Sequence, residues 1–290
     1  MRNNQDRLGA PPAPETPNQP VSGPAPEQEP APLSFSTPTE FVDLPSKGLL
    51  YPEDHPLHKQ ETVEIRYMTA KDEDILASRN LLKKGIAIDR LLQNVIVDKR
   101  IKIENLLVGD KNAIVIATRI TGYGSDYITN ITCPACASSV KHEFDLEDSH
   151  VIEGYKDLLE NDDSIEMTEN GTFLMTLPKL KVQVEVRLLT GADENRYLNM
   201  SKKKKQHNLV DSKMTDQLRL FIVSVNGDAS RKTIGQLIDN MPASDSRYLR
   251  FAYSELMPNV DLTQDFICEE CGHQQEMEVP LSANFFWPGR

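Results

Sequence analysis

Four cysteines form two closely spaced pairs, and thiolates at this spacing are suited to binding a metal ion. Cys133 and Cys136 lie in ITCPACASSVKHEFDL, and Cys268 and Cys271 lie in FICEECGHQQEMEVPL. Two residues separate the cysteines of each pair, so a tight turn can bring both sulfurs to one ion. Zinc prefers four ligands in a tetrahedron, so two such knuckles complete a closed structural site. We therefore predict one structural zinc ion per chain, although iron would fit the same ligands.

The long gap between the pairs leaves an alternative arrangement open. The 131 residues between Cys136 and Cys268 far exceed the gap of a compact zinc ribbon. Two separate sites with mixed ligands would use His142 and His273, which follow their pairs at unequal spacings, six residues after Cys136 but two after Cys271. A redox role would need C-x-x-C at the start of a helix, whereas β-prone residues follow each pair here. The pattern favours one shared site.

An internal repeat explains how distant cysteines could meet. VEIRYMTAKDE at residues 63–73 resembles VEVRLLTGADE at residues 184–194. Asp110 precedes Cys133 by 23 residues, and Asp245 precedes Cys268 by the same distance. The same order of strand, helices and C-x-x-C in both halves indicates a duplication. We expect two similar lobes, each ending in one knuckle, with the ion between them.

Local patterns predict the elements of each half. An alternating strand at 63–67 or 184–188 ends near a threonine that can cap a helix, with acidic residues in the helix's first turn. IDRLLQNVIV and DQLRLFIVSV predict amphipathic helices, and NAIVIATRI and RYLRFAYSEL predict a final helix in each half. Asn170-Gly171 predicts a hairpin turn. The predicted fold class is α+β, with a small antiparallel sheet and helices in each lobe, joined by a zinc-ribbon-like site.

Composition and the internal repeat divide the chain into three parts. Ten of the 19 prolines lie in residues 1–38, which carry few large apolar side chains, so this segment is predicted to be a disordered arm. Residues 39–150 are predicted to be the first repeat lobe, and residues 151–290 the second.

Several functional classes are disfavoured. The net charge of −12 disfavours nucleic-acid binding, although a zinc-ribbon nucleic-acid adaptor remains the alternative function. No apolar run approaches the roughly 20 residues of a membrane span, and the first residues do not form a secretory signal, so we expect a reducing cytoplasm. No phosphate loop, G-x-S-x-G or H-E-x-x-H motif is present, so the chain is not expected to be an enzyme. The run Lys202 to Lys205 is interpreted as a solvated loop or helix face.

The sequence resembles the baseplate hub and hub-assembly proteins of T-even-type contractile-tailed bacteriophages. The resemblance rests on LPSKGLLYP, EIRYMTAKDEDIL, LLVGDKNAIVIATRITGYGSDY, the CPAC knuckle and the terminal NFFWPGR. It implies a protein that contacts other baseplate or tail proteins, that acts in the host cytoplasm during assembly, and that is either retained in the virion baseplate or only assists its assembly. The resemblance supplies no catalytic residues.

Overall fold

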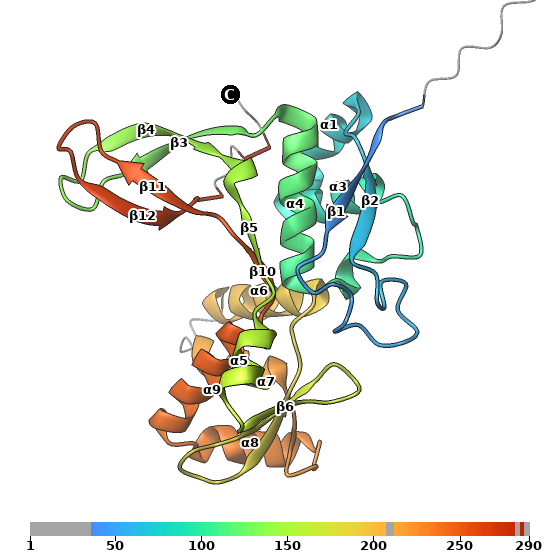
Figure 1. Cartoon of the computed structure of the whole chain (residues 1–290), viewed down its shortest axis with the longest axis vertical. Coiled ribbons are helices and arrows are strands. Elements are labelled where there is room, and N and C mark those ends of the chain that lie inside the picture. Colours follow the sequence, from blue (N-terminus) through green and yellow to red (C-terminus); the bar gives the residue numbers. More distant parts are fainter. Residues whose placement is uncertain (1–35, 207–211, 282–284, 287–290) are drawn as a thin grey trace, which may run out of the picture. The chain divides into compact units, whose positions relative to one another are not determined.

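The computed structural model describes residues 36–206, 212–281 and 285–286, and all of them except Ser36 belong to one compact unit. The predicted disordered arm at residues 1–38 therefore lies almost wholly outside the described residues. The described part is a mixed α+β structure with several small antiparallel sheets (Figure 1).

The first half combines a two-stranded sheet with four helices. Antiparallel strands β1 and β2 carry the buried residues Val42, Val63 and Ile65 toward these helices. The elements are β1 Thr39–Asp43, β2 Thr62–Arg66, α1 Ala70–Ala77, α2 Arg79–Lys84, α3 Ala87–Val95, the short 3-10 helix η1 Ile103–Asn105, and α4 Val108–Tyr123.

The second half has a four-stranded antiparallel sheet in the order β6-β7-β8-β9. The predicted turn at Asn170-Gly171 is confirmed, because it joins β6 to β7 and Gly171 has a positive φ of 71°. The elements are α5 Tyr155–Asn161, β6 Ile165–Met167, β7 Phe173–Thr176, β8 Gln183–Val186, α6 Gly191–Gln206, α7 Lys213–Phe221, β9 Ile222–Val225, α8 Arg231–Asn240 and α9 Ala243–Leu256.

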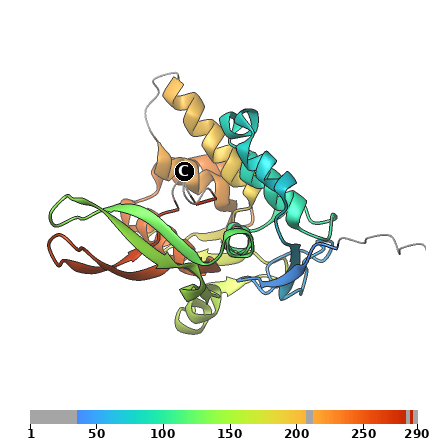
Figure 2. The same cartoon turned by 90° about the horizontal axis from the view of Figure 1, so that it is seen from above.

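Two β-hairpins, called the ribbon below, carry the cysteines. They run side by side in both views, in green and red (Figures 1 and 2). One hairpin pairs β3 Asp126–Thr132 with β4 Ser139–Asp145, and the other pairs β11 Thr263–Ile267 with β12 Gln274–Glu278. The chain leaves the first hairpin through η2 Leu146–Asp148 and β5 His150–Ile152, and it enters the second through β10 Asn259–Asp261. Strands β5 and β10 pair antiparallel and so join the two routes.

The predicted strand–threonine–helix segment is confirmed in the first half. Arg66 at the end of β2 donates two hydrogen bonds to Asp72 in the first turn of α1, at 2.7 and 3.0 Å. The backbone N–H and the hydroxyl of Thr69 each donate to the same carboxylate at 2.8 Å. The carboxylate thereby satisfies donors at a helix start, where backbone N–H groups lack partners within the helix.

The second half repeats this joint between strand and helix. Arg187 donates two hydrogen bonds to Asp193 at 2.7 and 2.8 Å, and Thr190 donates to it from its backbone N–H at 3.1 Å and from its hydroxyl at 3.0 Å. The basic run Lys202 to Lys205 continues α6 as a largely exposed helix face, where Lys204 pairs with Asp216.

The segment DQLRLFIVSV is not the single helix that its sequence predicted. Helix α7 ends at Phe221, and the remaining residues form β9, which pairs with β8. The reason is a contact distant in sequence. β-Branched Ile222 and Val225 fill the face of the sheet, and burial beside β8 outweighs the helical period of the preceding residues.

The two halves share one large hydrophobic core. It includes Ile65 and Ile114 from the first half together with Phe173 and Leu249 from the second. A smaller core packs the ribbon against α1, α3 and α4 of the first half. Residues on both sides of residue 150 are packed together in these cores. The division of the chain into two lobes at this residue stays a prediction.

In the part of the chain that the structure describes, no helix combines the length and the apolar character needed to cross a lipid bilayer.

Gly109 is predicted to be essential for the contact between α4 and the segment that leads to β10. A Cβ atom at Gly109 would lie 1.8 Å from the Pro258 carbonyl oxygen. Gly109→Ala should therefore lower the free energy of unfolding by about 3 kcal/mol through overpacking against backbone. Gly235 is a matched control, since it is also helical but a Cβ atom there would have no neighbour within 4 Å. Gly235→Ala should stabilise by about 0.5–1 kcal/mol. Urea denaturation measures both, and equal shifts would contradict the prediction.

Asp72 is predicted to make stability depend on acid pH. Burial acts to raise its pKa, but hydrogen bonds from Arg66, Thr69 and Asn94 lower the pKa from 3.8 to about 2. A lowered folded-state pKa contributes stability above the unfolded value, and this is lost as the pH falls toward about 2. When the pH falls from about 5 to about 3, the free energy of unfolding of Asp72→Asn should therefore decrease by about 1 kcal/mol less than that of the wild type. Urea denaturation measures this difference.

Asp98 provides the control, because it pairs with Arg100 at the surface. Asp98→Asn should change stability by less than about 0.5 kcal/mol at any pH. An identical pH dependence in the wild type and Asp72→Asn would contradict the role given to Asp72.

Candidate metal centre

The four cysteines predicted from the sequence lie together at the tips of the ribbon. The sulfurs of Cys133 and Cys271 are 3.8 Å apart, as are those of Cys136 and Cys268, and all four sulfurs lie within 4.8 Å of one another. A tetrahedral zinc ion with bonds of about 2.3 Å separates its sulfurs by about 3.8 Å. The observed spacing therefore fits a single four-sulfur site.

Each knuckle is a tight turn closed by two backbone hydrogen bonds. In the first, Cys133 N–H donates to the Ser138 carbonyl and Ala137 N–H donates to the Cys133 carbonyl, both at 2.9 Å. In the second, Cys268 N–H donates to the His273 carbonyl and Gly272 N–H donates to the Cys268 carbonyl, both at 2.8 Å. The two knuckles thus have the same backbone pattern, which turns both sulfurs of each pair toward one point.

The residue after the second cysteine has a left-handed backbone in both knuckles. Its φ is 58° at Ala137 and 70° at Gly272. Glycine adopts this conformation freely, whereas alanine pays a steric penalty from its Cβ atom. The same geometry at both positions shows that the turn itself requires it.

The knuckles bury one sulfur-bearing residue each and leave the other at the surface. Cys133 and Cys268 are buried, while Cys136 and Cys271 are exposed. Hydrogen bonds from the side chain and backbone of Ser138 lower the pKa of Cys136 to about 6. The backbone at His273 acts to lower the pKa of Cys271, but the neighbouring thiols raise it to about 12. Four sulfurs this close repel one another as thiolates, and a bound cation would remove that repulsion.

A site of four cysteines leaves no coordination position for water or substrate. Such a closed set is typical of structural zinc sites, whereas catalytic zinc keeps an open position. Thiolates also suit iron, so the geometry alone does not select the metal. The donor set therefore supports a structural role for whichever ion binds.

Neither histidine of the mixed-ligand alternative joins the four sulfurs. His142 lies on β4 and packs edge-on against Phe144 and Phe266, with ring centroids at 4.6 and 5.2 Å. The Nε2 atom of His273 lies 3.4 Å from the Oε1 atom of Gln275. Within the described ranges, the four cysteines are the one group of His, Cys, Asp and Glu close enough together to hold a metal. The geometry thus favours a shared site.

Arg119 supports the ribbon in a way that the sequence analysis missed. It lies near the end of α4 with 1% of its surface exposed. Its guanidinium donates to the carbonyls of Gly124, Asp126 and Phe285, at 2.9 Å for Asp126 and 2.7 Å for Phe285. It thereby ties α4 to the start of β3 and to the C-terminal segment. An arginine among apolar residues in NAIVIATRI was the one available signal.

Comparison with known proteins identifies one related family. The model of the family described as T4 bacteriophage base plate protein matches residues 39–287. No curated protein and no solved structure matches the chain. The matched range includes both knuckles and both halves of the fold.

One zinc ion per chain is predicted for reduced, freshly purified protein. Metal analysis should give this ratio, and X-ray absorption should show four sulfur ligands at about 2.3 Å. His142→Ala should keep the full zinc content, because His142 lies apart from the sulfurs. Protein without zinc, or a nitrogen ligand lost in His142→Ala, would contradict the four-cysteine site.

Proposed function

The chain belongs to the T4 bacteriophage base plate protein family, and from this premise we propose that it is a structural or assembly protein of the baseplate hub. It acts through contacts with other baseplate or tail proteins and catalyses no reaction. Its place of action is the host cytoplasm while the baseplate is assembled, and the finished virion baseplate where the chain is retained. The hub assignment is supported by the resemblance of LPSKGLLYP and NFFWPGR to hub and hub-assembly proteins.

Cys133, Cys136, Cys268 and Cys271 bind one structural zinc ion per chain. The observation that carries this assignment is the convergence of four sulfurs within 4.8 Å from cysteine pairs that are 131 residues apart. Packing beneath the tips supports it, because Phe144 and Phe266, one from each hairpin, are buried in the same core. The ion closes the ribbon by joining the tips of the two hairpins. Away from the tips, the strands of both hairpins already share one core.

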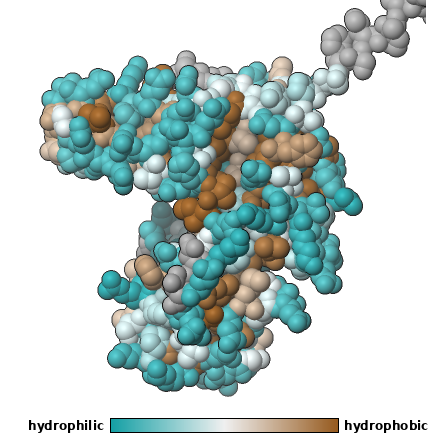
Figure 3. All heavy atoms as spheres, in the orientation of Figure 1, coloured by the Kyte–Doolittle hydropathy of each residue, from teal (hydrophilic) through white to brown (hydrophobic). Residues whose placement is uncertain are grey.

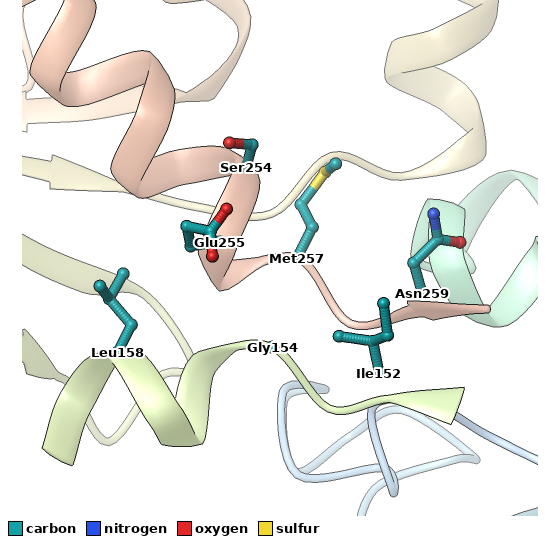
Figure 4. A pocket seen from close by; sticks show the side chains of 7 residues that line it. All are labelled: Ile152, Gly154, Leu158, Ser254, Glu255, Met257 and Asn259. Carbon is teal, nitrogen blue, oxygen red and sulfur yellow. The ribbon is translucent and has the colours of Figure 1, made fainter. Parts of the chain in front are cut away.

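The ribbon is linked to the second half by two antiparallel chain segments, and the place where they approach each other closely is called the crossing below. Ile152 and Gly154 lie on the outgoing segment, and Met257 and Asn259 lie on the returning one (Figure 4). A Cβ atom at Gly154 would lie 2.8 Å from the Met257 carbonyl oxygen, so the backbones approach closely there. A surface that includes the ribbon and the second half therefore depends on this crossing and on the closed knuckles.

An internal duplication accounts for the two knuckles. In each half the strand before the helices meets a segment that follows a later helix. Strand β2 meets the residue after α3 through the Ile65–Ile96 bridge, and β8 meets the strand after α7 through the Val186–Ile222 pair. The start of the final helix repeats as well. Asp110 accepts from Ser46 N–H at 2.9 Å, and Asp245 accepts from Lys179 N–H at 3.0 Å. Ser46 and Lys179 each follow a Leu-Pro pair. These shared contacts support descent from one ancestral unit.

The charge of the ribbon supports protein partners over nucleic acid. A hollow beside the hairpins is lined by five carboxylates and two histidines, with no lysine or arginine among its lining residues: His142, Glu143, Asp148, His150, Asp261, Thr263, Gln264, Asp265 and Glu276. On the face shown in Figure 3 the ribbon, at the upper left, is mostly hydrophilic. Phosphates would be repelled from such a surface.

Cys268→Ser is predicted to abolish assembly by opening the ribbon. Three remaining thiolates bind zinc more weakly, so the second hairpin loses its attachment at the tip. The test mixes wild-type or variant protein with a lysate from an infection that lacks this component, and counts assembled baseplates by electron microscopy. The expected result is a loss of more than about tenfold, alongside loss of zinc.

Glu270→Ser is the matched control, because Glu270 is exposed in the same knuckle and supplies no sulfur. It should keep both zinc and assembly. Lost zinc with full assembly in Cys268→Ser would show that the clamp is dispensable.

A further inference from the structure

Strand β1 has an open edge in the part of the chain that the structure describes. It pairs with β2 alone, and the flanking bonds Tyr67 N–H to Pro38 O and Leu44 N–H to Glu61 O set the register. In an antiparallel pair the N–H and C=O groups of successive residues point alternately toward and away from the partner strand. In this register those of Phe41 and Asp43 point away from β2. No described group bonds to them, and the Phe41 side chain is 66% exposed.

The second half shows the same edge covered. Strand β7 bonds to β8 through Leu177 N–H and Val182 O, the counterpart of the bond between Leu44 and Glu61. On its other side β7 bonds to β6, where Thr176 N–H donates to Ser164 O at 3.2 Å. Thr176 thus corresponds to Asp43, and Leu174 to Phe41. A strand placed on β1 as β6 is placed on β7 would satisfy the open groups.

The pairing of β6 with β7, called the template below, also indicates which side chains an added strand needs. Ile165 of β6 lies opposite Met175, and Met167 lies opposite Phe173, which is fully buried. The counterparts of Met175 and Phe173 in β1 are Val42, which is buried, and Glu40, which is exposed. An apolar residue therefore suits the position opposite Val42. A cationic residue suits the position opposite Glu40, because a carboxylate at a covered edge needs an opposite charge.

We propose that the open edge of β1 binds an extended segment of another protein, antiparallel to β1, with an apolar residue opposite Val42 and a lysine or arginine opposite Glu40. Main-chain hydrogen bonds provide the attachment and these two side chains provide the selectivity. This surface gives the protein–protein role proposed above a specific partner chemistry. Its test needs neither zinc nor an assembled baseplate, so either proposal can fail alone.

Two other occupants fit the edge less well. A second copy paired about Phe41 would place Glu40 opposite Val42, where β6 has an isoleucine opposite the corresponding residue, and would put two acidic side chains on each face of the paired strands. Residues 8–38, the stretch that directly precedes β1, contain no lysine or arginine, so this stretch offers no cation for Glu40. It also carries Pro30 and Pro32, which lack the N–H groups that a paired strand uses.

Two fluorescein-labelled peptides, TTITKTT and TTITETT, test the proposal by fluorescence anisotropy with the full chain. In the template register the isoleucine lies opposite Val42, and the lysine or glutamate lies opposite Glu40. The wild type should bind the lysine peptide about fivefold more tightly than the glutamate peptide at low salt. Glu40→Lys should reverse this preference. Glu53→Lys makes the same charge change at an exposed site outside β1 and should keep the wild-type preference.

Phe41→Pro tests the main-chain contribution. It removes an N–H group that points away from β2, so β1 stays paired with β2 while binding of both peptides falls below detection. Circular dichroism checks that the fold is retained. Failure of the wild type to bind either peptide, or a preference that Glu40→Lys leaves unchanged, would overturn the proposal.

Discussion

Buried aspartates at helix starts hold this structure together. Every aspartate that is buried among the described residues lies in the first turn of a helix: Asp72 in α1, Asp110 in α4, Asp193 in α6, Asp216 in α7 and Asp245 in α9. A helix N-terminus offers unpaired N–H groups and the positive end of the helix dipole, so a carboxylate tolerates burial there. Each carboxylate also accepts bonds from a strand, loop or neighbouring helix, and so fixes where its own helix begins.

The cysteine site depends on these fixed helix starts. Asp110 anchors α4 to Ser46 and Tyr51, and α4 leads into the first cysteine hairpin. Asp245 anchors α9 to Lys179 and Leu180, and α9 leads through β10 into the second hairpin. Both hairpins then pack on the first half, so the tips meet before any ion is considered. Metal binding at a prearranged site costs less chain entropy than at separate hairpins, so a bound ion and the fold would stabilise each other.

Features set by local sequence were predictable, and features set by distant contacts were not. The cysteine spacing, the threonine-capped helices and the Asn170-Gly171 turn all follow from a few adjacent residues, and the structure has each of them. Strand β9 was missed because its strand state depends on β8, which lies about 36 residues earlier in the chain. The role of Arg119 was missed because its three acceptors are main-chain carbonyls, which leave no mark in the side-chain pattern.

The two halves differ at the outer edge of the strand that pairs with β2 or β8, which is covered by β6 in the second half and open among the described residues of the first. Phe173 can be fully buried because β6 covers its edge of the sheet, and its counterpart Glu40 stays exposed because no described strand covers β1. A carboxylate there protects the edge, since an apolar strand laid over Glu40 would bury an unpaired charge. The same residue thus blocks indiscriminate pairing and admits a strand that brings its own cation. The comparison of β1 with β7 thus separates an edge that we propose for a partner strand from an edge that completes the core.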